Sequence, residues 1–293
     1  MILLNTGPSG PAGWSSSSEL IRCPRRWRLN TAGFVEGDRD ALIKGTLVHV
    51  GLAHYYARKQ ADQEGWGKPG GPPGANAYYE PAEAIAAIAQ ANGEAWIEHM
   101  SLAQRAVFDY TRRVGAEHVV AVEHLVAAEI PRMLPDNGEI SRALREKIPE
   151  IIIHRMRLDL ILKTPGGRYL IRDHKSSSNP KAGTTSFELS GQIIAMQWWG
   201  QRAYGDAFAG VEIGSINLTT GKLSFEIPRP APHAVQHWPA TRTWIEVQRA
   251  IGLEVFGESL AWPMALSDQG PCMDRYGPCG YRDSCRLGLP EKE

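Results

Sequence analysis

The sequence predicts an α+β fold: a central mixed β-sheet flanked by helices, with a helical insertion and a cysteine-rich C-terminal tail. Three observations predict this fold. Strand-like apolar runs gather in the middle of the chain, and helical patterns lie before and after them. Three of the four cysteines fall in the last 22 residues. At 293 residues, we expect a single domain over 1–293 that buries roughly three quarters of its unfolded surface.

Helical spacing of apolar residues comes first along the chain. It predicts a helix over residues 41–61 and another over 81–114, with a break near Gly93. Residues 65–78 are rich in glycine and proline and should form the loop between these helices. We therefore expect a helical insertion over residues 60–115, ahead of the sheet.

The remaining elements alternate between strand and helix. Strands are expected where β-branched and apolar residues are bounded by turn signals, and helices where the period lengthens. The predicted strands are residues 118–130, 151–163, 168–175, 212–219 and 222–227, and the predicted helices are 187–205 and 232–251.

Charged residues interrupt the predicted hairpin between 151 and 175. Asp173 and Lys175 are two residues apart and so share a face. A three-residue loop, Pro165-Gly166-Gly167, pairs residue 159 with 173 and places Asp159 on that face. A four-residue loop pairs 159 with 172 and turns Asp159 away unless a bulge intervenes. The sequence thus permits a cluster of two carboxylates and a lysine.

Such a cluster suits a divalent cation. Carboxylates with a backbone carbonyl favour Mg²⁺ or Mn²⁺, which polarise a phosphate and lower the pKa of a bound water. A nearby lysine can orient that water or stabilise charge in the transition state. An Asp-x-Lys triplet also arises by chance, or as an exposed ion pair that adds little stability.

The motif "RLDLIL…GGRYLIRDHKSS" resembles the core of the PD-(D/E)XK nucleases of the RecB-like branch. The segments "SSSSELIRCPRRWRL", "KGTLVHVGLAHYY" and "LSGQIIAMQWW" resemble that branch's opening helix, Gly-x-x-x-His element and glutamine-bearing helix. The resemblance covers most of the chain outside the insertion. It implies a restriction-endonuclease-like fold and a metal-dependent DNA nuclease.

The resemblance also implies roles for individual residues. His49, Asp159 and Asp173 would bind Mg²⁺ or Mn²⁺, and Lys175 would be the catalytic lysine. Two further residues, Glu123 and Gln192, would support the active site. From the residues alone, His49 is better explained as a satisfied buried histidine on an amphipathic helix. Glu123 is explained equally well as a solvent-facing strand residue. His54 is a poorer candidate, because no Gly-x-x-x-His pattern precedes it. Met156 and Met196 depart from the family pattern, which puts substrate contacts in question.

The four cysteines resemble the iron–sulfur subtype found among CRISPR-adaptation and AddB-type nucleases. That resemblance implies a [4Fe-4S] cluster held by Cys23, Cys272, Cys279 and Cys285, with the tail 257–293 packing with residues 15–30. The gap between Cys272 and Cys279 is longer than the subtype's. Four thiolates also suit a structural Zn²⁺, and unligated thiols or a disulfide are further alternatives.

The serine run at residues 15–18 predicts a helix start, because Ser16 and Glu19 have the spacing of a capping box. Arginines follow it, interleaved with a tryptophan, and could bind phosphates and stack on an unpaired base. A solvated basic face with the indole in the core is the alternative. The candidate DNA-binding residues are Arg22, Arg25, Arg26 and Trp27, with Arg28 beside them.

Composition bounds the remaining questions. Formal net charge is zero, with 32 basic and 32 acidic residues, so a polyanion must be bound by a local basic patch. Neither a membrane span nor a secretory signal is expected, which makes the cytoplasm the predicted location. No Walker-type motif occurs, so a helicase, recombinase or CRISPR-adaptation partner would be a separate chain.

The resemblance implies a DNA exonuclease that acts on single-stranded or resected ends. A catalytically weak DNA-binding subunit of a recombination or CRISPR-adaptation assembly is the alternative. A zinc-clipped hydrolase that processes RNA is a second one.

Overall fold

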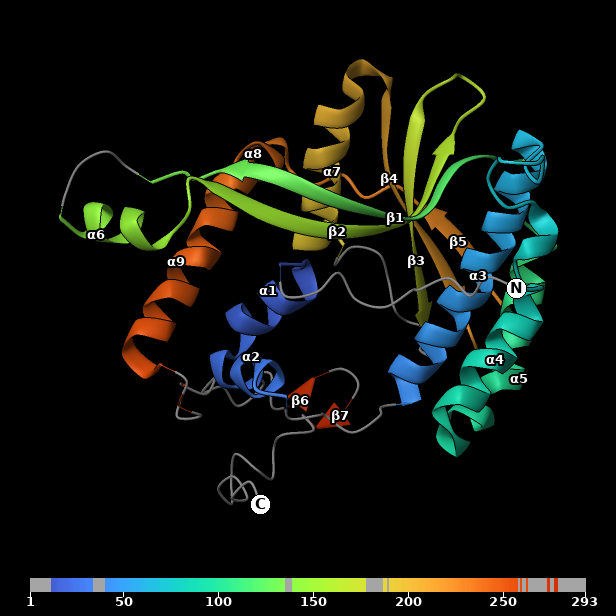
Figure 1. Ribbon diagram of the computed structural model, residues 1–293, viewed down its shortest axis with the longest axis horizontal. Coiled ribbons are helices and arrows are strands. Elements are labelled where there is room, and N and C mark those ends of the chain that lie inside the picture. Colours follow the sequence, from blue (N-terminus) through green and yellow to red (C-terminus); the bar gives the residue numbers. More distant parts are fainter. Residues whose placement is uncertain are drawn as a thin grey trace. The chain divides into compact units, whose positions relative to one another are not determined.

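The computed structural model describes residues 12–33, 40–134, 139–177, 187–188, 190–257, 259, 262, 273–274 and 277–278 (Figure 1). Its residues fall into two compact units. Of the described residues, those in 40–126 and 156–236 form the first unit, and those in 12–33, 127–155 and from 237 onward form the second. The candidate catalytic residues all belong to the first unit.

The first unit contains the sheet and the helices next to it. Two of its strands, β1 and β2, continue into the second unit. In chain order the elements are α3 (Asp40–Glu64), η1 (Ala75–Ala77), α4 (Pro81–Asn92), α5 (Glu94–Thr111), β1 (His118–Pro131), β2 (Ile151–Lys163), β3 (Tyr169–Ser177), α7 (Gly191–Tyr204), η3 (Gly205–Ala207), β4 (Phe208–Asn217), β5 (Leu223–Glu226) and α8 (Pro232–Gln236).

The described part of the second unit is mainly helical. It also includes the outer ends of β1 and β2. Its own elements are α1 (Trp14–Arg22), α2 (Pro24–Thr31), α6 (Glu139–Lys147), α9 (Trp238–Phe256) and two short strands, β6 (Met273–Asp274) and β7 (Gly277–Pro278).

Strands β1 to β5 form one sheet in the order β1-β2-β3-β4-β5. β2 and β3 are antiparallel, β3 and β4 are parallel with α7 as the crossover, and β4 and β5 are antiparallel. A mixed sheet flanked by helices is the predicted fold class, which is confirmed.

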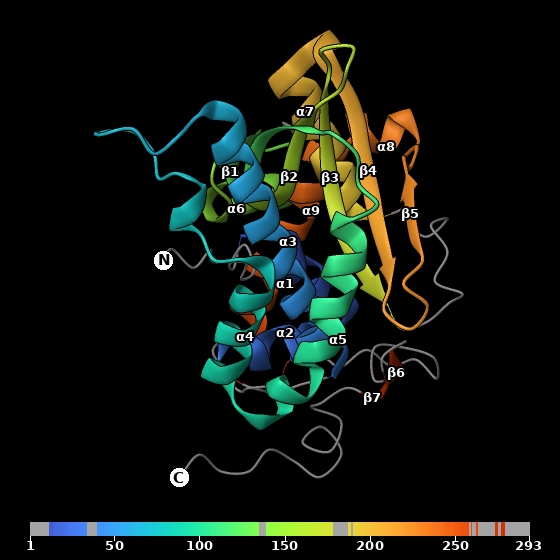
Figure 2. The ribbon, with the colours of Figure 1, turned by 90° about the vertical axis from the view of Figure 1, so that its right-hand side faces the viewer.

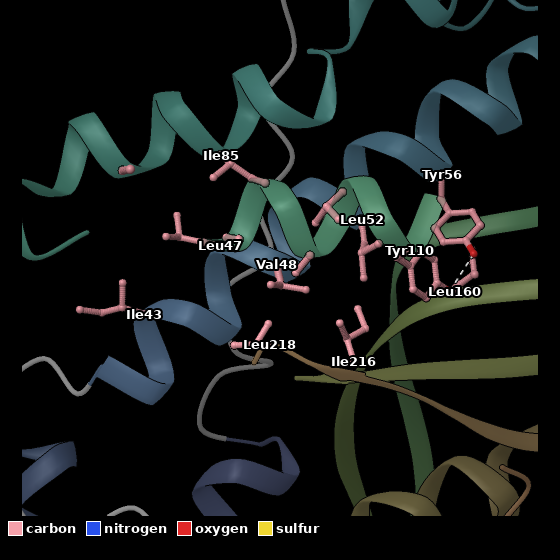
Figure 3. Close-up of a cluster of buried hydrophobic side chains, with 14 of the residues drawn as sticks. Ile43, Leu47, Val48, Leu52, Tyr56, Ile85, Tyr110, Leu160, Ile216 and Leu218 are labelled. Carbon is pink, nitrogen blue, oxygen red and sulfur yellow. Dashed lines mark hydrogen bonds between the residues drawn. The ribbon is translucent and has the colours of Figure 1, made fainter. Parts of the chain in front are cut away.

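The core of the first unit lies between one face of the sheet and helices α3, α4 and α5, which pack on one another (Figure 2). Figure 3 shows α3 contributing Ile43, Leu47, Val48 and Leu52 to this core. Along β3, Leu170 faces this core, so the adjacent Ile171 points to the opposite face. Ile171 is also fully buried, because α7 packs on β3 and β4 from that side.

Several helix boundaries differ from the predicted ones. Gly93, with φ 96°, separates α4 from α5 as expected. The capping box at Ser16 is wrong: α1 begins at Trp14 with Gly13 as its N-cap. The Ser16 hydroxyl instead accepts a hydrogen bond from Trp27 Nε1 at 3.0 Å.

The later elements also shift. β4 begins at Phe208, four residues before the predicted strand. The predicted last helix is divided into α8 and α9, and α6 was not predicted at all. Cys272, Cys279 and Cys285 lie outside the described residues. The single domain, the bounds of the insertion and the packing of the tail therefore remain predictions.

Candidate metal centre

The β2–β3 hairpin has the three-residue loop that the site requires. Leu160 pairs with Arg172 and Lys163 with Tyr169, which fixes the register. Gly167 has φ 79°, a left-handed conformation that glycine adopts without strain. Continuing the register by one residue sets Asp159 opposite Asp173, as the shorter loop predicts.

Asp159 lies where the hairpin ladder ends. Its Oδ2 accepts a hydrogen bond from the backbone N–H of His174 at 2.7 Å, replacing a main-chain carbonyl as the partner of that donor. The same oxygen is 3.4 Å from Nδ1 of His49 on α3. The carboxylate is thus held between β3 and α3.

Glu123 enters the same place through a strained backbone. Its φ of 48° is the only positive value among the non-glycine residues that the structure describes. Such a conformation costs about 1–3 kcal/mol and often serves to redirect a side chain at a functional site. The donor atoms of His49, Glu123 and Asp159 all lie within 4.8 Å of one another, close enough to share a metal ion.

Asp173 and Lys175 form the second half of the site, as expected from their shared face. Lys175 Nζ is 2.7 Å from Asp173 Oδ2 and donates to Gln192 Oε1 at 3.2 Å. The Gln192 amide on α7 donates in turn to Asp173 Oδ1 at 2.9 Å. Asp173 does not belong to the tight group of donors around Asp159. We call these six residues the carboxylate site.

The carboxylate site has a surplus of negative charge. Burial, aided by the charges of Asp159 and Asp173, raises the pKa of Glu123 to about 8, although Arg157 opposes the rise. Burial likewise raises the pKa of Asp159; Asp173 adds to the rise, while His49 and Lys175 oppose it. Both carboxyls therefore disfavour their charged forms until a cation is present.

The donor chemistry fits a hard divalent cation. Carboxylate oxygens are preferred by Mg²⁺ and Mn²⁺, and an imidazole ligand favours the transition metal of the two. His49 with Asp159 and either Glu123 or Asp173 would provide three ligands and leave positions for water and substrate. This arrangement is typical of a centre that activates a water molecule.

A sequence model of the PD-(D/E)XK nuclease superfamily matches residues 14–286. The chain belongs to the PD-(D/E)XK nuclease superfamily. Nucleases of this superfamily use divalent metals and act on DNA. Asp159 and the Asp173-His174-Lys175 triplet have the order and spacing of its signature, and the structure brings them together on adjacent strands. A search of curated proteins found no match to this chain.

The opposite face of β3 holds a buried polar cluster that the sequence did not predict. Arg172 Nη1 is 2.6 Å from Glu117, and Arg172 Nε is 2.5 Å from Glu212. The hydroxyls of Tyr56 and Tyr110 are 2.9 Å apart, joined in Figure 3, and both accept from the guanidinium. We call these five residues the arginine network. An arginine within the apolar run "YLIRDHK" was its one visible signal.

His174 links the two faces. The residue is 2% exposed, and its Nε2 lies 3.0 Å from the Tyr110 hydroxyl. Burial lowers the pKa of His174 well below its usual value, and His49 and Arg172 lower it further. This histidine is therefore neutral. Its backbone N–H donates to Asp159 in the carboxylate site, and its ring is hydrogen-bonded to Tyr110 of the arginine network.

The predicted DNA-binding residues of the second unit differ from one another in exposure. Arg22 is exposed, and Arg25 and Arg26 are partly buried. Trp27 is buried against Trp262, so the stacking role predicted for it finds no support in its position. Cys23 is buried at the junction of α1 and α2. Among the described helices, none is long and apolar enough to cross a bilayer.

Proposed function

We propose that this chain is a DNA exonuclease that hydrolyses phosphodiesters at single-stranded or resected ends. The observation that carries the proposal is the convergence of His49, Asp159 and Glu123, with Asp173 and Lys175 beside them, on adjoining strands and one helix. Their negative surplus fits a cation better than a closed structural ion pair. The preference for ends rests on the resemblance to RecB-like nucleases.

The residues have separate roles in this proposal. His49, Asp159 and either Glu123 or Asp173 hold Mg²⁺ or Mn²⁺, which when bound lowers the pKa of water and polarises the phosphate. Lys175 Nζ, oriented by Asp173 and Gln192, stabilises negative charge as the water attacks. Glu123, whose pKa is raised to about 8 in the absence of the cation, would release its proton as the cation binds.

Digestion of linear and circular single-stranded DNA of one sequence tests the proposal. With Mg²⁺ or Mn²⁺, the wild type should degrade the linear strand and leave the circle intact, while Lys175→Ala should degrade neither. Equal attack on the circle would show an endonuclease. Equal activity of Lys175→Ala, or no activity in the wild type, would remove the proposed catalytic role. An RNA strand in parallel separates a DNA enzyme from one that processes RNA.

We also propose, from the sequence pattern, that the four cysteines hold a structural [4Fe-4S] cluster. Four thiolates satisfy the ligand requirement, and hydrolysis needs no redox step. Anaerobically purified protein should be brown with about four irons per chain. Stoichiometric zinc without iron would establish the zinc alternative, and neither metal would leave the thiols unligated.

A basic contact to DNA at α2 is a further part of the proposal. Arg25→Ala should lower the slope of log affinity against log salt by about one, because one phosphate contact is lost. An unchanged slope would take Arg25 out of the interface. A separate helicase, recombinase or CRISPR-adaptation protein would supply the DNA end, and copurification from a native source would identify which.

A further inference from the structure

A chain of aromatic side chains begins at His124 on β1. His124, directly after Glu123 on β1, contacts Trp199 of α7 with ring centroids 6.4 Å apart. Trp199 meets Tyr204 edge to face at 5.7 Å, and Tyr204 stacks on Tyr169 of β3 at 4.2 Å with 13° between the planes. We call these four residues the aromatic track.

The track lies on the side of α7 that serves the catalytic residues. Trp199 follows Gln192 by seven residues, which places it on the same helix face about 10 Å further along. Gln192 is hydrogen-bonded to Asp173 and Lys175. The track thus shares two elements with the carboxylate site, β1 through Glu123 and α7 through Gln192.

The track residues are not core residues. His124 is exposed, and Trp199, Tyr204 and Tyr169 are each partly exposed. The other close aromatic pairs of the protein include Tyr56 with Tyr110 and Trp27 with Trp262, whose members are all buried. Tyr169 and Tyr204 already stack on each other, so His124 and the partly exposed Trp199 are the rings suited to stacking on a planar ligand.

The surroundings of the track favour a polyanion. Lys163, an exposed residue of β2, places its Nζ 5.9 Å from the Tyr169 ring. Arg202, in the last turn of α7, is exposed, and its guanidinium lies over the Trp198 ring at 5.1 Å. Positive groups interleaved with aromatic rings are what single-stranded nucleic acid requires, since the cations neutralise phosphates while the rings stack on bases.

The backbone around the track is fixed by close packing. A Cβ added to Gly200 would come within 2.2 Å of the Phe208 ring on β4. This close approach holds the end of α7 against β4. The Tyr204 ring also stacks on that of Phe208, with centroids 6.3 Å apart. The rings are thus presented by rigid elements, which limits the entropy lost when a base binds.

We infer that the aromatic track binds the unpaired bases of a single DNA strand and leads it into the carboxylate site. The inference rests on the proposed function, because the nuclease assignment is what makes the ligand DNA. A duplex would not fit the same role, since its base faces are already stacked on one another. The track thus gives the enzyme its preference for single strands.

The test is binding of a fluorescein-labelled dT20 strand, by anisotropy in EDTA, in a Lys175→Ala background that cannot cleave. Each of the first ten positions is replaced in turn by an abasic site. One or two positions should weaken binding about tenfold, because stacking on one base is lost. In Trp199→Leu, binding of the intact strand should fall by a similar factor, and those abasic positions should cost nothing more.

The controls are matched to this design. Trp199→Phe keeps a stacking face and should retain most of the affinity. Trp244→Ala removes another exposed tryptophan, on α9, and should bind dT20 as the parent does. A dT20·dA20 duplex should bind equally well to the parent and to Trp199→Leu. Circular dichroism checks that each variant is folded.

Three results would overturn the inference. One is a parent protein insensitive to every abasic position, which needs no variant at all. Another is normal dT20 binding by Trp199→Leu. The third is weakened binding in which the abasic penalties persist unchanged, since the loss would then be structural. In the cleavage-competent protein, Trp199→Leu should raise KM with kcat retained. Absence of any cleavage by the wild type would count against the proposed function and not against the track.

Discussion

Strand β3 carries charged side chains on both faces, and the two faces are built on opposite plans. On one, the arginine network places a single guanidinium among two carboxylates and two hydroxyls. On the other, the carboxylate site sets Glu123, Asp159 and Asp173 against one lysine. Each combines a buried residue of β3, Asp173 or Arg172, with partly exposed partners, so exposure alone does not separate a structural cluster from a catalytic one.

The difference lies in how well the charges are matched. Burial alone would lower the pKa of Arg172, yet Tyr110, Tyr56, Glu212 and Glu117 raise it, so the network favours its charged state. In the carboxylate site the pKa of Glu123 and that of Asp159 both rise, so the charged state is disfavoured. A cluster whose charges are matched within the protein fits a structural role. A cluster that lacks a positive charge fits a binding site for a cation.

The largest expected effect is on the arginine network. Arg172→Met should destabilise the protein by about 3–5 kcal/mol, because Glu117 and Glu212 would be left buried without their partner. Denaturant unfolding measures the change. The exposed Arg105→Met on α5 should stay within about 0.5 kcal/mol of the wild type. A similarly small change for Arg172→Met would mean that the network does not stabilise the fold.

The opposite outcome is expected for the carboxylate site. Asp159→Asn should lower cleavage by roughly 10²–10³-fold, since a negative ligand is lost at the centre. The metal-free variant should nonetheless be more stable than the wild type at pH 8, because a raised pKa means that ionised Asp159 destabilises the fold. The asparagine Oδ1 still accepts from His174. Paired activity and unfolding measurements decide, and a loss of both would make Asp159 a structural residue.

The sequence predicted the carboxylate site better than the arginine network for a physical reason. Strand alternation has a period of two, so the pairing of Asp159 with Asp173 followed from the loop length alone. Arg172 instead bonds Glu117, which lies 55 residues earlier in a loop. No local pattern specifies such a contact, because it depends on how α5 and β1 pack.

Two further differences also depend on tertiary structure. Glu123 was a candidate from its strand position, but its φ of 48° and its approach to His49 could not be read from "VVAVEHL". The capping box at Ser16 failed because the Trp27 indole binds that hydroxyl from the next helix. Local rules placed the elements, and long-range contacts decided the details at their ends.

A smaller effect on activity is expected from Gln192 in the carboxylate site. Gln192→Met removes the amide that bridges Asp173 and Lys175 while keeping the side-chain length. We expect kcat to fall between about 10- and 100-fold, the value of a hydrogen bond to a charged group. Gln197→Met on the same helix is the matched control and should keep the wild-type kcat. Equal kcat in both variants would show that Lys175 is positioned without the amide.

The smallest expected effect is on the pH dependence of stability, which should differ between the carboxylate site and the arginine network. The folded-state pKa of Glu123, about 8, lies above the usual 4.5, so its contribution to stability is complete below pH 4.5 and is lost as pH rises through 8. Metal-free protein should therefore lose about 1 kcal/mol between pH 7 and 8. Glu123→Gln should remove that loss, whereas Glu212→Gln in the arginine network should not. Mn²⁺ should reverse it, with a proton released on binding that calorimetry in two buffers detects. If the stability of the metal-free protein does not vary over this range, Glu123 is already charged. Its charge would then be compensated within the protein, and the carboxylate site would not lack a positive charge that a cation could supply.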